Sequence, residues 1–329
     1  VQTGIWNDEM IKVSHLTKRY GDITAVDDIS FDIRKGELFG FLGPNGAGKT
    51  STINMIIGLS RPSAGTITVD GIDAASRTKK AQAIMGIVPD ESNLYNELDG
   101  FENLCFCASL YGMRKKEREE KAHYLLEQFR LEKAGKRPFK AYSKGMRRKL
   151  TIAAALIHSP KILFLDEPTT GIDVESSRHI REMIVELKKN GTTIFLTTHY
   201  IEEAERICDR IAFICEGQIV ATGSVPQLMD RVTHGHAIQF VTDKTSTSYT
   251  GDLQTRFKGS VVTTRSGNSL VMRSDRRIPL YPVMEFFHGK GIEVYEAREL
   301  HPSLEDVFVE LTGIESTVLR KEKEKGGFS

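Results

Sequence analysis

The chain has 329 residues, of which 27% are charged and 40% are hydrophobic, and its formal net charge is only +1. This composition is typical of a folded globular protein of about two domains, and the balanced charge gives no overall indication of a polyanion partner. The longest uncharged apolar stretches, "NLCFCASLYGM" and "TIAAALI", are shorter than the roughly 18 to 20 residues of a membrane-spanning helix. The four cysteines form no CxxC pair, which favours free thiols in a reducing compartment over a metal centre.

The N-terminal part combines short strands with a glycine-rich loop. Strands are predicted at residues 10–16, 26–33 and 36–43. The loop "GPNGAGKT" follows at residues 43–50, and the apolar periodicity of residues 51–59 predicts a helix directly after it. The sequence therefore predicts a strand, a glycine loop and a helix in that order.

The middle of the chain begins with a helical segment at about residues 93–158 and then returns to strands. Two short apolar runs, 161–168 and 192–199, are typical of strands buried on both faces of a parallel sheet. Near the end of the helical segment, "AYSKGMRRKL" sets four cations beside a serine and a glycine. Such a run is usually a solvated helix face, and a nucleic-acid contact is the sharper alternative.

The C-terminal part has a different pattern of predicted secondary structure. Strand-like segments at 236–243, 260–266, 269–274 and 292–300 alternate with helices near 279–291 and 303–313. We therefore expect an α/β core over residues 1–225, a small α+β accessory domain over 226–313 and a solvated charged tail over 314–329.

"GPNGAGKT" fits the phosphate-loop pattern G-x-x-x-x-G-K-[ST], and it lies between a predicted strand and a predicted helix as that pattern requires. Loop N–H groups and the helix N-terminus would surround phosphates, Lys49 would reach the β- and γ-phosphates, and Thr50 would ligate Mg²⁺. The alternative is a glycine-rich turn without a ligand. The predicted nucleotide-binding residues of this segment are Gly43, Asn45, Gly46, Ala47, Gly48, Lys49, Thr50 and Ser51.

Two further strand ends carry polar residues. "ILFLDEP" places Asp166 and Glu167 at the end of a buried strand, where ligands of open α/β sheets bind. Asp166 would hold Mg²⁺, and Glu167 would orient and deprotonate the attacking water. "TTIFLTTH" ends at His199, for which a γ-phosphate contact is favoured over an ordinary satisfied histidine.

The order of "GPNGAGKT", "YSKGM", "ILFLDEP", "TTGID" and "TTH" resembles that of the ATP-binding cassette (ABC) transporter ATPases, over about residues 10–225. The resemblance implies a P-loop NTPase core of the ABC type, with an antiparallel β subdomain and a helical subdomain at 93–158. It also implies that Tyr20 stacks on adenine and that Asp173 lies in the loop after the catalytic glutamate. Ser143 and Gly145 match the signature motif, and His199 matches the switch histidine.

This resemblance explains the basic patch. Signature residues of the family contact the γ-phosphate bound by the partner subunit. Ser143 is also a good N-cap, so the helix after it would present free N–H groups and its dipole to an anion. The cations Lys144, Arg147, Arg148 and Lys149 would reinforce that positive end, and no nucleic-acid partner is needed.

The motifs depart from the family pattern at two places. Lys144, Gly145 and Met146 replace the usual glycine pair and glutamine of the signature, a form associated with ATPases whose exporter permease is a separate polypeptide. Asp90 stands where the family has a glutamine. A carboxylate there could ligate Mg²⁺, but it would also repel the γ-phosphate.

The resemblance implies an ATP- and Mg²⁺-dependent exporter subunit on the cytoplasmic face of the membrane. Two chains, as a homodimer, would close head to tail around two nucleotides and drive a separate permease. The permease would dock near Asp90, Leu94, Tyr95 and Phe101. A soluble ABC ATPase acting on nucleic acid or ribosomes is the alternative, although such proteins tend to carry two cassettes or a coiled-coil insertion. A P-loop kinase is disfavoured by Glu167 and the signature helix.

Overall fold

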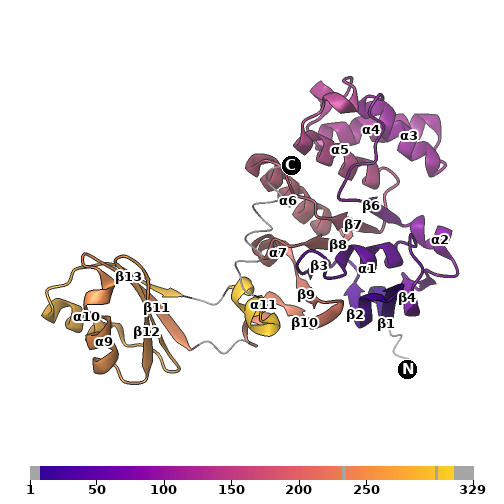
Figure 1. Ribbon diagram of the computed structural model, residues 1–329. Coiled ribbons are helices and arrows are strands. Elements are labelled where there is room, and N and C mark those ends of the chain that lie inside the picture. The colour runs from indigo at the N-terminus through magenta and orange to yellow at the C-terminus, as the bar shows by residue number, and fades with distance from the viewer. Residues whose placement is uncertain (1–7, 232–234, 301–302, 315–329) are drawn as a thin grey trace, which may run out of the picture. The chain divides into compact units, whose positions relative to one another are not determined.

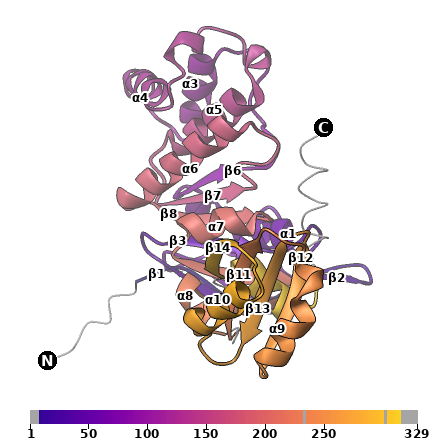
Figure 2. The same cartoon turned by 90° about the vertical axis from the view of Figure 1, so that its left-hand side faces the viewer.

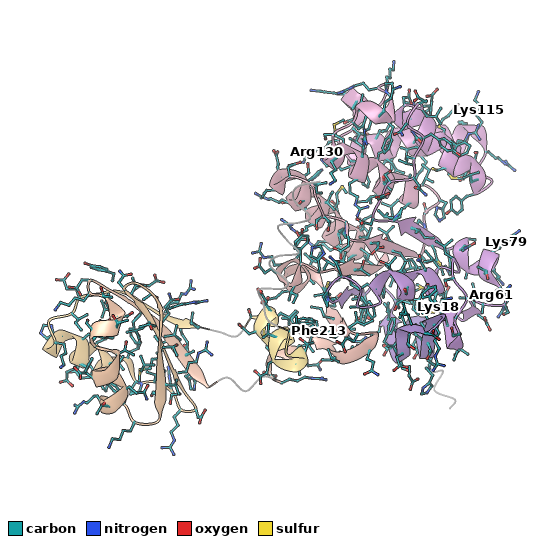
Figure 3. The ribbon with its side chains drawn as sticks, viewed as in Figure 1. Lys18, Arg61, Lys79, Lys115, Arg130 and Phe213 are labelled. Carbon is teal, nitrogen blue, oxygen red and sulfur yellow. The ribbon has the colours of Figure 1, made fainter. Side chains whose placement is uncertain are left out.

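A computed structural model of the protein describes residues 8–231, 235–300 and 303–314. Its contacts divide the chain into two compact units, residues 1–228 with 308–329 and residues 229–307. The boundaries therefore differ from those expected for an accessory domain at 226–313, because helix α11 (Leu304–Thr312) ends in the first unit. Phe308 of α11 packs there against Phe213, labelled in Figure 3, with 5.2 Å between the ring centroids. The charged tail expected after Ile314 lies outside the described residues.

Two sheets form the framework of the first unit (Figure 1). The larger sheet has the order β10-β9-β3-β8-β7-β6, and all its neighbours are parallel except β10 and β9. Its strands are β3 (Leu38–Leu42), β6 (Met85–Val88), β7 (Ile162–Asp166), β8 (Thr193–Thr198), β9 (Arg210–Cys215) and β10 (Gln218–Ser224). The smaller, antiparallel sheet has the order β2-β1-β4-β5, with β1 (Glu9–Tyr20), β2 (Ile23–Arg34), β4 (Ala64–Val69) and β5 (Ile72–Asp73).

The central strands β3, β7 and β8 are buried along their whole length. Alternating residues of β7 point to opposite faces, so that Phe164 joins the core shared with the smaller sheet and Leu165 joins the core under the helices. This two-sided burial explains why these strands are continuous apolar runs rather than alternating ones.

Helices cover both faces of the larger sheet. Helix α1 packs into the core that the two sheets share, whereas α6 and the helical subdomain pack on the opposite face. Figures 1 and 2 show α3, α4 and α5 gathered at one end of this unit. The helices are α1 (Lys49–Ile56), α2 (Thr78–Gln82), α3 (Gly100–Leu110), α4 (Lys115–Gln128), α5 (Lys144–Leu156), α6 (Val174–Lys189), α7 (Ile201–Ile207) and α8 (Val225–Met229), with 3-10 turns at Glu132–Ala134 and Phe139–Ala141.

The second unit is a four-stranded antiparallel sheet with two helices packed on it. The strand order is β12-β13-β11-β14, and its core joins Phe240 of the sheet to Leu253 of α9 and Phe287 of α10. The elements are β11 (His236–Thr242), β12 (Ser260–Ser266), β13 (Ser269–Ser274), β14 (Val294–Leu300), α9 (Thr250–Arg256) and α10 (Leu280–Gly289), with a 3-10 turn at Ser246–Ser248.

The predicted fold class is therefore confirmed: a P-loop α/β core with an antiparallel β part and a helical part, followed by a small α+β unit. All four cysteines are free thiols. In the described part of the chain, no helix combines the length and the apolar character that crossing a bilayer would require.

Candidate active site

The phosphate loop runs between the end of β3 at Leu42 and the start of α1 at Lys49. Two of its glycines are required by close backbone packing. A Cβ at position 43 would lie 2.1 Å from the Ile214 carbonyl oxygen. Gly48 has a φ of 106°, and a Cβ there would lie 2.6 Å from the Ala25 carbonyl oxygen.

Lys49 lies buried at the base of this loop. Its ammonium group donates hydrogen bonds to the carbonyl oxygens of Gly43, at 2.6 Å, and Pro44, at 3.2 Å. The loop runs from Asn45 to Gly48 and leads into the first turn of α1. On that turn Thr50 is exposed and Ser51 is half-buried. The helix N-terminus and the ammonium group therefore belong to the same loop, and both favour binding of an anion.

The three residues predicted to be catalytic lie in one cluster. Glu167 follows the last residue of β7, and its Oε1 lies 3.5 Å from Lys49 Nζ. Its Oε2 lies 2.9 Å from His199 Nδ1, just beyond the end of β8. The parallel pairing of β3, β8 and β7 places these three strand ends at one edge of the sheet.

Glu167 is held in a left-handed backbone conformation, with a φ of 47°. Its N–H donates to the Thr197 carbonyl oxygen at 3.1 Å, and the Thr170 hydroxyl donates to its Oε2 at 3.1 Å. Few non-glycine residues adopt such a φ, and they cluster at functional sites where the surrounding structure imposes it. Neighbouring contacts therefore fix this carboxylate.

The two acids of the site have opposite pKa shifts. Burial raises the pKa of Asp166 despite the hydrogen bond from the Thr197 hydroxyl at 2.5 Å, and the negative charge of Glu167 raises it further. Burial also acts to raise the pKa of Glu167, but His199 and Lys49 outweigh it and the pKa is lowered. Glu167 is thus an ionised proton acceptor at neutral pH, while the charge of Asp166 is costly unless a cation neutralises it.

Several buried atoms of the cluster lack a hydrogen-bond partner among the described residues. These are Glu167 Oε1 and both ring nitrogens of His199, of which Nδ1 lies 2.9 Å from Glu167 Oε2. Buried polar atoms are rarely left without partners in folded proteins. An ionised carboxylate oxygen only accepts hydrogen bonds, so Glu167 Oε1 fits a donor such as water, whereas an N–H of His199 fits an acceptor such as a phosphate oxygen.

Tyr20 lies apart from the catalytic cluster, at the end of β1, and is 49% exposed. Lys18 Nζ lies 4.7 Å from the centre of its ring and donates to the Arg61 carbonyl oxygen; Figure 3 labels both cations. The pKa of the tyrosine is lowered, mainly by a hydrogen bond with Ser60. Partial burial opposes this shift, and a hydrogen bond with Ser51 adds to it. The predicted adenine-stacking residue therefore lies near Ser51 of α1, with an exposed ring.

Asp90, the unusual acid of the predicted set, is an exposed residue in the loop after β6. Partial desolvation raises its pKa, Arg148 opposes that shift, and Glu167 adds to it. The carboxylate thus responds to the charge of Glu167 and belongs to the electrostatic surroundings of the cluster.

The signature residues meet the loop that carries Asp173. Ser143 is the exposed N-cap of α5, and its hydroxyl accepts a hydrogen bond from the Met146 N–H at 3.2 Å. Gly145 is buried so tightly that a Cβ would lie 2.4 Å from the Ser176 hydroxyl and 3.4 Å from an Asp173 carboxylate oxygen. Asp173 in turn caps α6 through the Ser176 N–H, at 2.8 Å. The structure therefore brings Gly145 and Asp173 together within one chain.

One expectation about the basic patch is wrong. Arg148 does not reinforce the exposed end of α5: its side chain is only 7% exposed and donates to backbone carbonyls at the ends of β6 and β7. The sequence signal was its helical spacing from Ile152 and Ala155, which are also buried. Thr197 and Thr170, which hold the two acids, were not identified from the sequence either.

Comparison with known proteins agrees with this geometry. Residues 26–170 match the family model described as ABC transporter. The chain is 36% identical over 320 residues to Nod factor export ATP-binding protein I of Ralstonia nicotianae, covering 95% of this chain and 96% of the relative. It is 43% identical over 230 residues to the linearmycin resistance ATP-binding protein LnrL of Bacillus subtilis, covering 70% and 74%.

The chain belongs to the ABC transporter ATPase family. Among solved structures it resembles an ATP binding subunit of an ABC transporter, with a TM-score of 0.63 and 32% identity over 68% of this chain and 92% of that one. It also resembles the ATP-binding cassette MJ0796, solved as a dimer in a post-hydrolysis state with ADP and Pi, with a TM-score of 0.61, 26% identity, and 65% and 98% coverage. The predicted recognition and ATPase activity are confirmed at the level of this family.

Replacing Glu167 with Gln tests the assignment of the general base in this ABC ATPase. The Glu167→Gln variant keeps the shape of the side chain but cannot accept the proton of water, so we expect turnover to fall by about 10² to 10⁴-fold. Binding of a fluorescent ATP analogue should remain within a few-fold of the wild type, because the phosphate loop is unchanged. Near-normal phosphate release from the purified variant with Mg²⁺ present would contradict the assignment.

Replacing Asp166 with Asn tests whether the buried charge of Asp166 lowers the stability of the folded protein. Because its folded-state pKa is raised, Asp166 favours folding while protonated, and this contribution is lost as the pH rises through that pKa. The Asp166→Asn variant, which mimics the protonated form, should therefore have a nucleotide-free Tm at or above that of the wild type at pH 8, with a smaller difference at low pH. Calorimetry across this range measures it, with Asp252→Asn as the surface control. A variant that melts below the wild type by the same amount at every pH would contradict the prediction.

Proposed function

We propose that the protein is the ATP-hydrolysing subunit of an ABC exporter that works as a head-to-tail dimer and drives a separate membrane permease. The observation that carries the catalytic part is the cluster of Lys49, Glu167 and His199, with its unpaired buried atoms. The exporter assignment is supported by relatives over nearly the whole chain, among them the Nod factor export protein and the daunorubicin resistance ATP-binding protein DrrA3 of Streptomyces coeruleorubidus.

In this proposal, the loop and Lys49 bind the phosphates of ATP, and Tyr20 stacks on the adenine. The loop N–H groups and the N-terminal end of α1 contribute their dipoles to the binding of the anion. Lys49 adds a buried positive charge whose present hydrogen-bond acceptors are loop carbonyls. Asn45, Gly46 and Ala47 shape the same loop and belong to the binding residues.

Thr50 and Asp166 are the residues that would hold Mg²⁺, and Asp90 is a further candidate. No group of three or more histidine, cysteine or acidic side chains in the described residues could hold a metal by itself. This agrees with Mg²⁺, which proteins usually bind through one or two carboxylates together with substrate phosphates. When bound, Mg²⁺ would neutralise phosphate charge, and its positive charge would oppose the burial that raises the pKa of Asp166 and the repulsion from Glu167 that adds to it.

Glu167 would then take the proton of the attacking water. Its carboxylate is ionised, fixed by Thr170 and directed toward the position that Lys49 also faces. His199 approaches Glu167 with one ring nitrogen, and its second nitrogen has no partner among the described residues. We propose that this second nitrogen contacts the γ-phosphate.

The exposed N-cap of α5 is the observation that supports the proposed dimer. Ser143 lies at a helix N-terminus that carries Lys144 and Arg147 but no phosphate loop. In a head-to-tail pair, this cap would complete the nucleotide site of the partner subunit. Gly145 and Asp173 would position it, because they pack together beneath the cap.

The exposed apolar residues that follow Asp90 are the observation that supports the proposed contact with a permease. Tyr95 is 55% exposed, and its ring lies edge-on to that of Phe106, with 5.0 Å between the centroids. Leu110, one turn further along α3, is also exposed, whereas Leu94 and Phe101 are partly buried against the helical core. An exposed apolar patch of this kind marks an interaction site, and we propose that a permease segment binds it.

Mixing two inactive variants tests the dimer. Lys49→Ala disables the phosphate loop, and Ser143→Arg blocks the cap by its bulk, so either homodimer has two defective sites. In a mixed dimer one site collects both defects and the other is intact, so ATPase activity should return on mixing, to at most about half of the wild-type rate per mixed dimer. Persistent inactivity, with mixed dimers detected and single-site turnover shown by a tandem fusion, would rule out the contribution in trans.

Cell fractionation tests the permease. The protein should sediment with membranes only when its permease is co-expressed, and Tyr95→Glu should weaken this by placing a charge in the apolar patch. Tyr124→Glu, an exposed tyrosine on α4, is the matched control. Sedimentation with ribosomes in the absence of any permease would instead favour a soluble ABC ATPase.

A further inference from the structure

Arg148 connects three parts of the active site that are far apart in the sequence. It lies on the second turn of α5, the helix that Ser143 caps. Its guanidinium group donates to five backbone carbonyl oxygens, which belong to two loops at the end of the larger sheet. The acceptors are Asp166 at 2.6 Å, Glu167 at 2.5 Å, Pro168 at 3.0 Å, Asp90 at 3.1 Å, and Pro89.

These carbonyls surround the reacting groups. Those of Asp166, Glu167 and Pro168 follow one another where β7 ends, and the other two lie where the chain leaves β6. The regular hydrogen bonds of the sheet end where β6 and β7 end, so the buried carbonyl oxygens beyond them need other hydrogen-bond donors. Arg148 supplies them, because a guanidinium group has five donors in a rigid plane.

The arrangement is specific to arginine. All five acceptors are main-chain atoms, so the contact fixes the course of the backbone rather than neutralising one acid. A lysine carries a single ammonium group and cannot reach both loops in this way. Glu167 has the positive φ of 47°, so its carboxylate direction depends on the backbone that Arg148 holds on both sides of it.

We propose that Arg148 is a positioning residue for ATP hydrolysis, which sets the backbone at Glu167 and at Asp90 according to the position of the signature helix α5. A displacement of α5 is then transmitted directly to the general base and to the loop after β6. In the proposed dimer, on which this second step rests, contact of the Ser143 cap with the partner's nucleotide would be passed to Glu167 of the same chain.

The experiment compares Arg148→Gln, Arg148→Lys and Arg148→Ala with the wild type in the full-length protein. We expect kcat to fall by about 10²-fold in all three, since a misplacement of about 1 Å can cost this much. The KM for ATP and the affinity for a fluorescent ATP analogue should stay within about three-fold, because the carbonyl oxygens that Arg148 holds lie where β6 and β7 end and not in the phosphate loop. Arg178→Gln, which removes an exposed guanidinium paired with Glu182, is the matched control and should keep the wild-type kcat.

Chemical rescue separates positioning from loss of folding. Arg148→Ala leaves space for a guanidinium ion, so millimolar guanidinium chloride should restore kcat with saturation, whereas ammonium chloride should not. The same salts should leave Lys49→Ala inactive. A kcat that stays near the wild-type value in Arg148→Gln overturns the proposal. So does a loss of kcat without rescue that matches the unfolded fraction measured by circular dichroism.

The proposed dimer can fail independently of this inference. Glu167→Gln should form an ATP-bound dimer, detected by light scattering, whether or not Arg148 has a positioning role. If that dimer does not form while guanidinium still rescues Arg148→Ala, the local role of Arg148 is supported and the dimer is rejected. If the dimer forms but Arg148→Gln retains its kcat, the dimer is supported and the role of Arg148 is rejected.

Discussion

The active site depends on the parallel pairing of β3, β8 and β7. Parallel strands end at the same edge of a sheet, so Leu42, Thr198 and Asp166 bring Lys49, His199 and Glu167 within one cluster, although these residues are far apart in the sequence. The strands can lie side by side only because they are apolar on both faces. The buried core and the position of the chemistry are therefore two consequences of one arrangement.

The same burial lowers the stability of the folded protein when no ligand is bound. Asp166 and Glu167 are adjacent buried acids: burial raises the pKa of Asp166 even though Lys49 opposes the shift, whereas His199 and Lys49 lower the pKa of Glu167. Charges taken out of water destabilise a fold unless they are paired. Mg²⁺ would provide the missing partner of Asp166, so binding of Mg²⁺ with a nucleotide should stabilise this edge of the sheet more than any other region of the first unit.

The sequence was sufficient for the parts that local pattern determines. The loop "GPNGAGKT", the apolar runs of β7 and β8 and the strands of the second unit were predicted from spacing and hydrophobicity. The roles of Arg148 and Thr197 were not, because each depends on a partner in another strand or helix. The helix α11 was predicted, but the whole of it was assigned to the accessory domain: Phe308 packs against Phe213 of β9, a contact that no local pattern contains.

The contacts of Gly145 and Arg148 imply that α5 moves with the catalytic loops. Gly145 has no room for a Cβ beside Ser176, so α5 and the start of α6 cannot slide past each other without a clash. Arg148 fastens the next turn of α5 to the carbonyls on both sides of Glu167. The exposed Ser143 cap is therefore connected to the backbone of Glu167 through a short series of packed contacts.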